Sequence, residues 1–311
     1  METSDNRKSR LRIVLAKPAD FVPALEVQFQ HLPEAEAYAR TSNALQLLKG
    51  KGLETPRLLL AEDDDEILGV ILAQALVGGT GIVWPPQIAL EARDRRMLED
   101  ALIRRALDWL RQNGAKLAQA VLFEDENRHA GPLERNGFSH PTQLWYLRHE
   151  LELSPELLCE PETLTFQSYA ECDRELFQQM LWRSYGQTRD FPEVSGRRSI
   201  GEVVHGLQAI GYDPARWWLA WSSQTPVGVL VLTAAPEVDG CEVSYVGVVP
   251  DARRRGVGRE LVRKALFEAK AMGGHEVVLS VDARNEPALN LYAKLGFEVF
   301  ERREVYLALW E

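Results

Sequence analysis

A cluster of arginine and glycine residues in the second half of the chain points most directly to chemistry. Residues 253–259 read Arg-Arg-Arg-Gly-Val-Gly-Arg, in a chain whose formal net charge is −10. Where a strand turns into a helix, unpaired amides and the positive end of the helix dipole bind anions. Glycine lets a phosphate approach the backbone, and arginine adds charge-assisted hydrogen bonds. On this evidence alone, the segment is either a phosphate site or an arginine-rich turn in solvent.

Two widespread phosphate motifs do not fit this segment. A Walker A loop needs Gly-Lys followed by Ser or Thr, which is absent here. The run that begins at Gly256 does not complete the dinucleotide pattern Gly-x-Gly-x-x-Gly. Nucleotide hydrolysis and dinucleotide binding are therefore not the expected functions.

Two motifs together resemble those of the GCN5-related N-acetyltransferase (GNAT) family. The first, Arg/Gln-x-x-Gly-x-Gly/Ala after a strand, reads Arg-Arg-Arg-Gly-Val-Gly at 253–258. The second reads Asn-Glu-Pro-Ala-Leu-Asn-Leu-Tyr-Ala-Lys-Leu-Gly-Phe at 285–297. Their order and separation make the pair more specific than either motif, and the resemblance covers roughly residues 165–311.

The resemblance implies acetyl-CoA as the acyl donor. Loop amides from Arg254 to Gly258 would hold its pyrophosphate, and the preceding strand would pair with pantetheine as with an added strand. Asn285 matches the family residue that bonds the pantetheine arm. The implied cofactor-binding residues are Val246, Val248, Val249, Arg253, Arg254, Arg255, Gly256, Val257, Gly258, Arg259 and Asn285.

The implied reaction is attack of a neutral amine on the thioester, which needs a proton acceptor and is helped by a proton donor. Tyr292 stands where the family places a tyrosine beside the CoA sulfur, and a phenol can protonate a thiolate. Glu242 stands where many relatives carry a glutamate that acts through water. The alternative for Tyr292 is an aromatic side chain that packs on the sheet. The alternative for Glu242 is a solvated residue at the end of its strand. Strand alternation predicts Tyr245 on the face opposite Glu242.

Strands and helices that would position these residues can be read from the second half. Runs rich in Val, Leu and Trp predict strands over 217–221, 227–233, 242–249 and 276–281. Val262, Leu266 and Ala269 share one face of a helix that ends at Gly273, and a shorter helix runs from Asn285 to Gly296.

The first half repeats this order of elements. Residues 58–107 align with 217–266 without a gap, with Gly69 on Gly228 among the identities. We therefore expect an α/β (α+β) fold of two tandem GNAT-like domains, each a central mixed, mostly antiparallel sheet flanked by helices. Proline and charge place a linker near 152–163, which gives domains at 10–152 and 163–311. This arrangement is similar to that of the mycothiol synthases.

The first copy lacks the residues that would do the chemistry. The gapless register and the shorter second motif predict these replacements: Met97 for Gly256, Glu99 for Gly258, Val83 for Glu242 and Glu134 for Tyr292. A side chain would crowd the phosphate, and a carboxylate at a helix start would compete with it for the amides. We expect the first domain to be noncatalytic.

The acceptor side is less well defined. In the family, the first helices and loops of the domain build it, and Tyr185, Arg189, Asp190 and Phe191 form a polar and aromatic stretch there. An ordinary loop is an equal alternative. The expected function is acetyl transfer from acetyl-CoA to a primary amine of a small molecule. A peptide or protein N-acetyltransferase and a noncatalytic acyl-CoA sensor are the alternatives.

Composition limits the remaining possibilities. The 311 residues, 45% hydrophobic and 26% charged, suffice for two globular domains. Net negative charge disfavours nucleic-acid partners, no apolar run reaches the roughly 20 residues of a membrane span, and the polar start resembles no signal peptide. The three cysteines lack metal-ligand spacing. We expect a cytoplasmic monomer or homodimer with a small-molecule amine acceptor and no metal, nucleic-acid or membrane partner.

Overall fold

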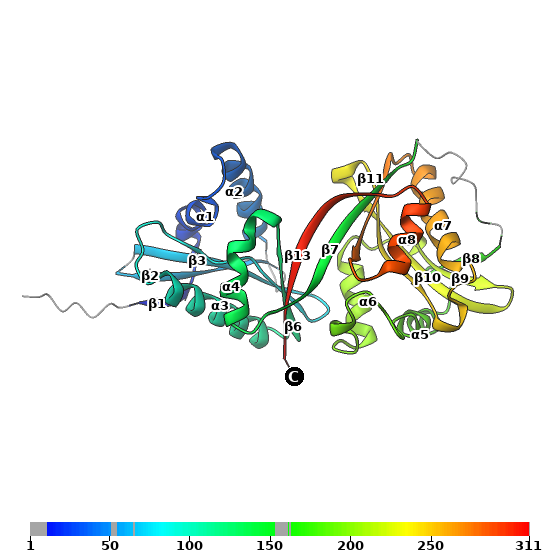
Figure 1. The fold of residues 1–311 in the computed structure, drawn as a ribbon, viewed down its shortest axis with the longest axis horizontal. Coiled ribbons are helices and arrows are strands. Elements are labelled where there is room, and N and C mark those ends of the chain that lie inside the picture. Colours follow the sequence, from blue (N-terminus) through cyan, green and yellow to red (C-terminus); the bar gives the residue numbers. More distant parts are fainter. Residues whose placement is uncertain (1–10, 51–54, 65, 153–160, 162, 311) are drawn as a thin grey trace, which may run out of the picture. The chain divides into compact units, whose positions relative to one another are not determined.

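The computed structural model describes residues 11–50, 55–64, 66–152, 161 and 163–310, which form two compact units (Figure 1). One unit comprises residues 1–141 and 305–311, and the other comprises residues 142–304. Residues 142–150 thus group with the second unit and the last seven residues of the chain with the first. The linker expected near 152–163 lies mostly outside the described residues, and the domain limits 10–152 and 163–311 stay a prediction.

The second unit contains a mixed, mostly antiparallel sheet, as predicted. Its strands follow the order β7-β12-β11-β10-β9-β8, and only β11 and β12 run parallel. The four strands expected from the sequence are present as β9 to β12. The strands of this sheet are β7 (Ser139–Glu150), β8 (Thr165–Ser168), β9 (Trp217–Ser222), β10 (Thr225–Ala235), β11 (Gly240–Val248) and β12 (Glu276–Asp282).

Helices cover both faces of this sheet. A Cβ on Gly228 would lie 3.0 Å from Leu261 of α7, whereas a Cβ on Gly247 would lie 2.5 Å from the Ser184 hydroxyl of α5. The two helices therefore pack on opposite faces, because Gly228 pairs with Val248 and so shares the face opposite Gly247. The helices are α5 (Arg174–Ser184), α6 (Ile200–Ala209), α7 (Val257–Ala271) and α8 (Glu286–Lys294).

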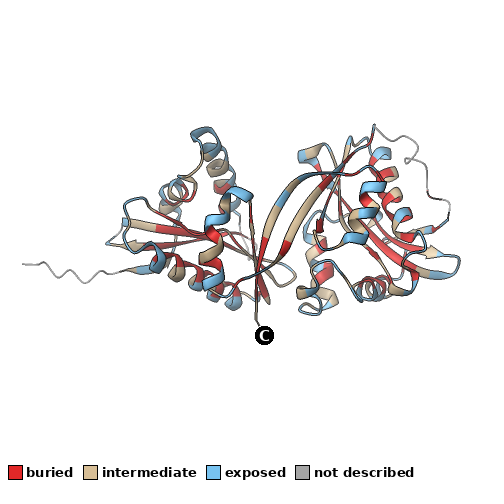
Figure 2. Ribbon diagram, in the orientation of Figure 1, coloured by how far each residue is buried: buried red, intermediate tan, exposed pale blue. Residues whose placement is uncertain are grey.

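The first unit repeats the plan with the strand order β1-β2-β3-β4-β6-β13 and β5 paired to β3. Figure 2 shows the buried residues along the sheet and the inner helix faces of each unit. Its strands are β1 (Arg12–Leu15), β2 (Arg57–Asp63), β3 (Glu66–Leu76), β4 (Thr80–Val83), β5 (Gln87–Ile88), β6 (Leu117–Leu122) and the end of β13 (Glu298–Leu309), and its helices are α1 (Phe21–Phe29), α2 (Glu34–Leu48), α3 (Arg95–Gln112) and α4 (Ala130–Arg135).

The predicted register holds along the long helix of each copy. When the two helices are aligned with one constant offset in residue number, most buried residues of α3 fall on buried residues of α7. The matches run from Leu98 and Val257 to Leu110 and Ala269. However, α3 begins at Arg95, so it already includes the residues aligned with the glycine loop that precedes α7. Met97 is therefore helical where Gly256 is a left-handed turn residue.

Two of the expected replacements are wrong by one residue. Ile82, not Val83, takes the place of Glu242. The reason is that the turn before β4, residues 77–79, is one residue shorter than the turn before β11, residues 236–239. Leu133, not Glu134, takes the place of Tyr292. The carbonyls of both residues accept hydrogen bonds from the amides of the phenylalanines that follow their helices, Phe138 and Phe297.

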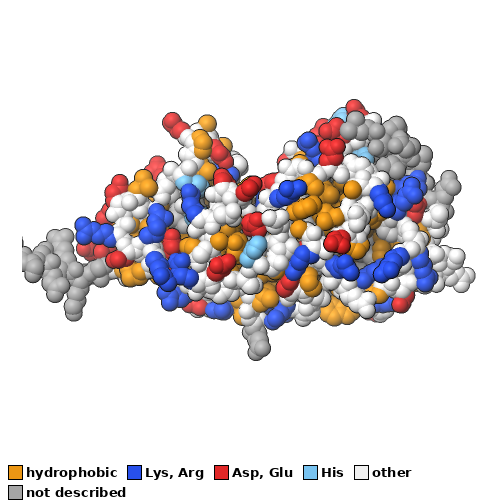
Figure 3. All heavy atoms as spheres, in the orientation of Figure 1, with side chains coloured by type: hydrophobic (Ala, Val, Ile, Leu, Met, Phe, Trp, Pro, Cys, Tyr) orange, Lys and Arg blue, Asp and Glu red, His pale blue; other side chains and the backbone are white. Residues whose placement is uncertain are grey.

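Charged side chains of both signs are interspersed on the face drawn in Figure 3. This distribution agrees with a chain that carries 36 basic and 46 acidic residues. In the described part of the chain, no helix is long and apolar enough to cross a bilayer. The same residues hold no cluster of three or more His, Cys, Asp or Glu side chains that could bind a metal.

Candidate active site

The two parallel strands of the second unit separate at Glu242. Residues Gly240 to Glu242 of β11 pair with Glu276 to Val278 of β12. Beyond that point β11 stays paired with β10 as far as Val248, and β12 stays paired with β7 as far as Asp282. Within the described residues, the backbone of 243–248 thus has one edge without a strand partner. Unpaired backbone edges accept an extended partner, so this edge fits an amide-bearing chain.

A β-bulge in β11 changes the predicted facing of Tyr245. Val243 pairs with Leu232 and Tyr245 pairs with Val231, which leaves Ser244 as the extra residue. Tyr245 therefore lies on the same face as Glu242, toward α5, and the prediction from simple alternation was wrong. Its hydroxyl is 2.8 Å from the Ser184 hydroxyl.

The loop before α7 has the backbone of an anion site. Arg254 has a φ of 59° and Gly256 a φ of 85°, and left-handed residues in a turn aim successive amides into one concavity. Helix α7 then begins without a side-chain cap at its N-terminus. A Cβ on Gly258 would lie only 3.2 Å from Leu291, so the start of α7 approaches α8 closely.

The predicted basic residues of this loop fall into two groups. The Arg253 guanidinium donates hydrogen bonds to four backbone carbonyls, those of Val248, Ser184, Gly186 and Gln187, at 2.7–3.2 Å. It therefore joins the end of β11 to the end of α5. The remaining three side chains are exposed and form no ion pair with a described residue: Arg254, Arg255 and Arg259.

Tyr292 is a buried phenol on α8. The residue is 5% exposed, and its ring centroid lies 5.7 Å from that of Phe297. Burial raises the pKa of Tyr292, and the negative charge of Asp190 raises it further. The phenol is therefore protonated at neutral pH and can donate a hydrogen bond, although its raised pKa makes it a weaker acid than an ordinary tyrosine.

Glu242 lies half-buried where β11 and β12 separate. Burial raises the pKa of Glu242, and the charge of Glu237 raises it further. It forms no hydrogen bond or ion pair with another described residue. A carboxylate with a raised pKa is a better match for general-base chemistry near neutral pH than an ordinary surface glutamate.

Three of the four predicted acceptor residues line one small pocket. Tyr185, Asp190 and Phe191 contribute to it, whereas Arg189 is exposed and lies outside its lining. Asp190 is exposed as a residue, but desolvation of its carboxyl group raises its pKa and the neighbouring charge of Asp282 raises it further, while hydrogen bonds partly oppose both effects. The other lining residues are Trp182, Val194, Ser195, Gly196, Arg198 and Val203.

Comparison with known proteins places this geometry in a family. The model described as "Acetyltransferase (GNAT) family" matches residues 175–297. The chain is 32% identical over 127 residues to the peptidyl-lysine N-acetyltransferase YjaB of Escherichia coli (strain K12), a match that covers 40% of this chain and 76% of that protein. The chain belongs to the GNAT family. The predicted family and enzyme class, N-acetyltransferase, are thereby confirmed.

Longer matches connect this GNAT chain to mycothiol acetyltransferases. The match to that of Corynebacterium glutamicum (strain R) is 29% identical over 150 residues, 47% of this chain and 51% of the relative, so it spans about half of that relative's length. The match to that of Nocardia farcinica (strain IFM 10152) is 29% identical over 250 residues, 78% and 79% of the two chains. A solved tandem GNAT protein from the clavulanic acid biosynthesis pathway shares the fold, with a TM-score of 0.54, 14% identity and coverage of 96% and 98%.

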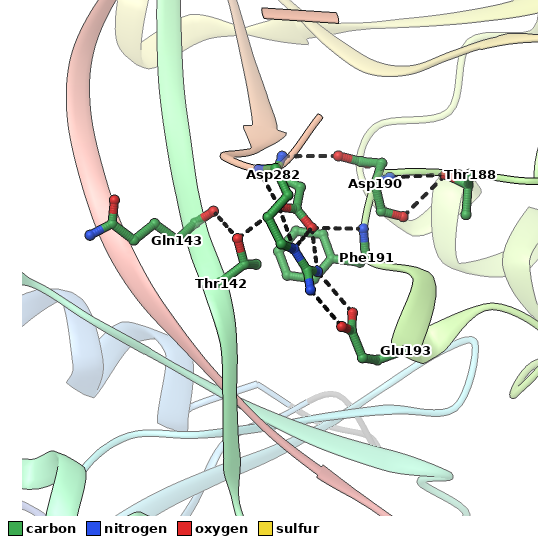
Figure 4. Close-up of polar contacts among 8 residues, drawn as sticks. Thr142, Gln143, Thr188, Asp190, Phe191, Glu193 and Asp282 are labelled. Carbon is green, nitrogen blue, oxygen red and sulfur yellow. Dashed lines mark hydrogen bonds and ion pairs between the residues drawn. The ribbon is translucent and has the colours of Figure 1, made fainter. Parts of the chain in front are cut away.

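One group of residues in this GNAT unit was missed by the sequence analysis. Asp282 ends β12, is fully buried and contacts the segment 188–194, which we call the acceptor loop (Figure 4). Arg284 follows it and reaches Glu193 of that loop. The available signal was an aspartate at the end of an apolar strand with an arginine two residues later. That pattern is too common to interpret without knowing which loop packs beside it.

Proposed function

We propose that the second unit transfers the acetyl group of acetyl-CoA to a primary amine of a small molecule, by direct attack of the amine on the thioester. The observation that carries this proposal is the separation of β11 from β12 beside an uncapped helix start. One opening thereby offers a strand edge for amides and a cluster of backbone N–H groups for phosphate.

The donor would lie along β11 and end at the loop. Pantetheine would pair with the backbone of Val246 and Val248, and Asn285 at the start of α8 would bond the same arm. Amides of 254–258 would hold the pyrophosphate, with exposed arginines close enough to add charge-assisted contacts. Arg253 would contribute by shaping the loop, since most of its N–H groups already bind backbone carbonyls.

The chemistry would divide between two groups with raised pKa values. The neutral amine nitrogen would attack the thioester carbonyl carbon, and Glu242 would take, through water, the proton that the nitrogen loses as the C–N bond forms. When the tetrahedral intermediate collapses, the C–S bond breaks and Tyr292 would give its proton to the departing sulfur. The raised pKa of Glu242 suits a base, and the protonated phenol of Tyr292 can stabilise the departing thiolate by a hydrogen bond before the proton moves.

A small-molecule acceptor is supported by the names of the relatives. The relatives matched along most of both chains are named mycothiol acetyltransferases, whereas the relative named for peptidyl-lysine matches less of this chain. The presence of proton-transfer groups favours an enzyme over a noncatalytic acyl-CoA sensor.

The test is the release of free CoA thiol from acetyl-CoA with a panel of amines that includes amino sugars, amino acids, polyamines and a lysine peptide. We expect a small amine to accelerate release, with the acetylated product identified by mass spectrometry. Tyr292→Phe should lower kcat about tenfold or more at unchanged acetyl-CoA affinity, because it removes only the proton donor. The exposed Tyr212→Phe is the control. Tight acetyl-CoA binding without acceleration by any amine would favour the sensor.

A further inference from the structure

We propose that Asp282, Arg284 and Glu193 form a clasp that positions the acceptor loop for amine binding. This inference rests on the proposed function and assigns new residues to it. None of the three has to touch the reacting atoms, so they are positioning residues. Figure 4 shows Asp282 at the end of β12 and Glu193 on the acceptor loop.

The inner part of the clasp is Asp282. Its side chain has no exposed surface, and its carboxylate accepts hydrogen bonds from the Thr142 hydroxyl at 2.7 Å and from the Phe191 amide at 3.1 Å. Its own amide donates to Asp190 Oδ1 at 2.9 Å. A single residue at the end of β12 therefore holds two consecutive residues of the acceptor loop.

The backbone of Phe191 has a conformation that this hold would stabilise. Phe191 has a φ of 44° and a ψ of 59°, a left-handed conformation that a side chain with a Cβ disfavours. Such conformations persist where the surroundings over-determine them and concentrate at functional sites. Here the Phe191 amide is aimed at the buried carboxylate, and the same turn of the backbone directs Asp190 toward Tyr292 and Asn285.

The outer part of the clasp is a bidentate ion pair. Arg284 donates to Glu193 Oε1 at 2.7 Å and Oε2 at 3.0 Å, and to Asp282 Oδ2 at 2.7 Å. Burial alone would raise the pKa of Asp282, but hydrogen bonds from Arg284, Thr142 and Phe191 lower it overall. Both carboxylates thus remain charged near neutral pH and keep the loop joined to the segment that leads into α8.

The clasp fixes one wall of the acceptor pocket and meets the proposed donor residues only at Asn285, whose amide donates to the Asp282 carbonyl at 2.8 Å. The phosphate loop and the β11 edge lie on other elements, 253–258 and 243–248. Loosening the clasp should therefore weaken productive amine binding and leave acetyl-CoA affinity unchanged. A residue that merely stabilised the unit would affect both.

The test is a double-mutant cycle with Glu193→Gln and Arg284→Gln in the full chain. With the panel amine that the wild type acetylates fastest, each single change should raise KM about fivefold, and the double variant should be no worse than the poorer single. Calorimetry should show unchanged acetyl-CoA affinity. Asp213→Asn is the control, because it removes an ion pair of 3.0 Å to Arg216 elsewhere in the same unit.

Hydrogen exchange provides a readout that needs no amine. Peptides covering 188–194 should exchange faster in the clasp variants than in wild type or Asp213→Asn, whereas peptides of α7 should be unchanged. Unaltered exchange in the acceptor loop would overturn the clasp, as would an equal loss of amine and acetyl-CoA binding. If the wild type acetylates no amine, the proposed function fails, and the exchange data still decide whether the clasp holds the loop.

Discussion

The starts of α3 and α7 differ although the helices they begin are equivalent. Both helices begin after a left-handed residue without a side-chain cap, Asp94 for α3 and Gly256 for α7, but α7 lies beside three exposed arginines that lack an ion pair among the described residues. Helix α3 begins about one turn earlier in the common register, at Arg95. At the position of Gly258 it carries Glu99, whose carboxylate is paired with Arg135 at 3.2 Å.

The same contrast continues through the rest of each unit. In the pairing register, Gly247 of β11 corresponds to Gln87 of β5. Gln87 is buried and lies 3.1 Å from the ring of His129, which is also buried. Together with Ile82 and Leu133 in place of the proposed base and acid, the first unit keeps the sheet and helices but fills their opening with its own side chains. The proposal that only the second unit is catalytic therefore rests on a few positions and not on a difference of fold.

Introducing the carboxylate of the first unit into the second should have the largest effect. We expect Gly258→Glu to abolish detectable acetyl-CoA binding, because the new side chain would meet Leu291 and its charge would compete with phosphate for the α7 amides. Calorimetry would measure it. Gly201→Glu is the matched control, since that glycine also lies in the first turn of a helix and a Cβ there meets nothing within 4 Å. Unchanged binding in the Gly258 variant would remove the loop from the donor site.

Removing the carboxylate that the first unit lacks should have the next largest effect. We expect Glu242→Gln to lower kcat/KM for the amine by a hundredfold or more, with acetyl-CoA binding retained. Because burial raises the pKa of Glu242, wild-type activity should fall as the pH drops through that raised pKa, and the residual activity of the variant should lack this step. A variant with the wild-type rate and pH profile would assign the base to another group.

Much of this contrast could be predicted from sequence because it depends on local patterns. Glycine stops and apolar periodicity located α7 and α8, and the motifs located the loop and Tyr292. The gapless alignment correctly matched the buried faces of α3 and α7, but it failed wherever a turn or a helix start differed in length. Ile82 and Leu133 became evident only from strand pairing and from hydrogen bonds at the helix ends.

Other parts of the site depend on contacts between distant segments. The bulge at Ser244 follows from pairing with β10, so strand alternation could not reveal that Tyr245 and Glu242 share a face. The use of Arg253 as a clamp on α5 depends on a helix that ends 69 residues earlier in the sequence. Asp282 likewise acquires its role from the acceptor loop, which lies 91 residues away at Phe191.

The filled opening of the first unit should also make that unit sensitive to acid, with a smaller effect. Burial, and to a lesser extent Arg128, lowers the pKa of His129 from 6.5 to about 4. The unfolded chain therefore binds this proton at higher pH than the folded unit. The contribution of His129 to the free energy of unfolding is fully present above about pH 6.5 and is lost as the pH falls toward 4. The loss between pH 7 and pH 5 is about 2 kcal/mol.

His129→Gln should remove this pH dependence while keeping a polar group beside Gln87. Thermal unfolding and hydrogen exchange of first-unit peptides at pH 7 and pH 5 would measure it, with the exposed His205→Gln in the second unit as the control. The wild type should lose protection in the first unit at pH 5, and the His129 variant should lose less. Equal losses in both proteins would mean that the buried histidine does not limit stability, and that the side chains filling this opening are less tightly packed than their burial indicates.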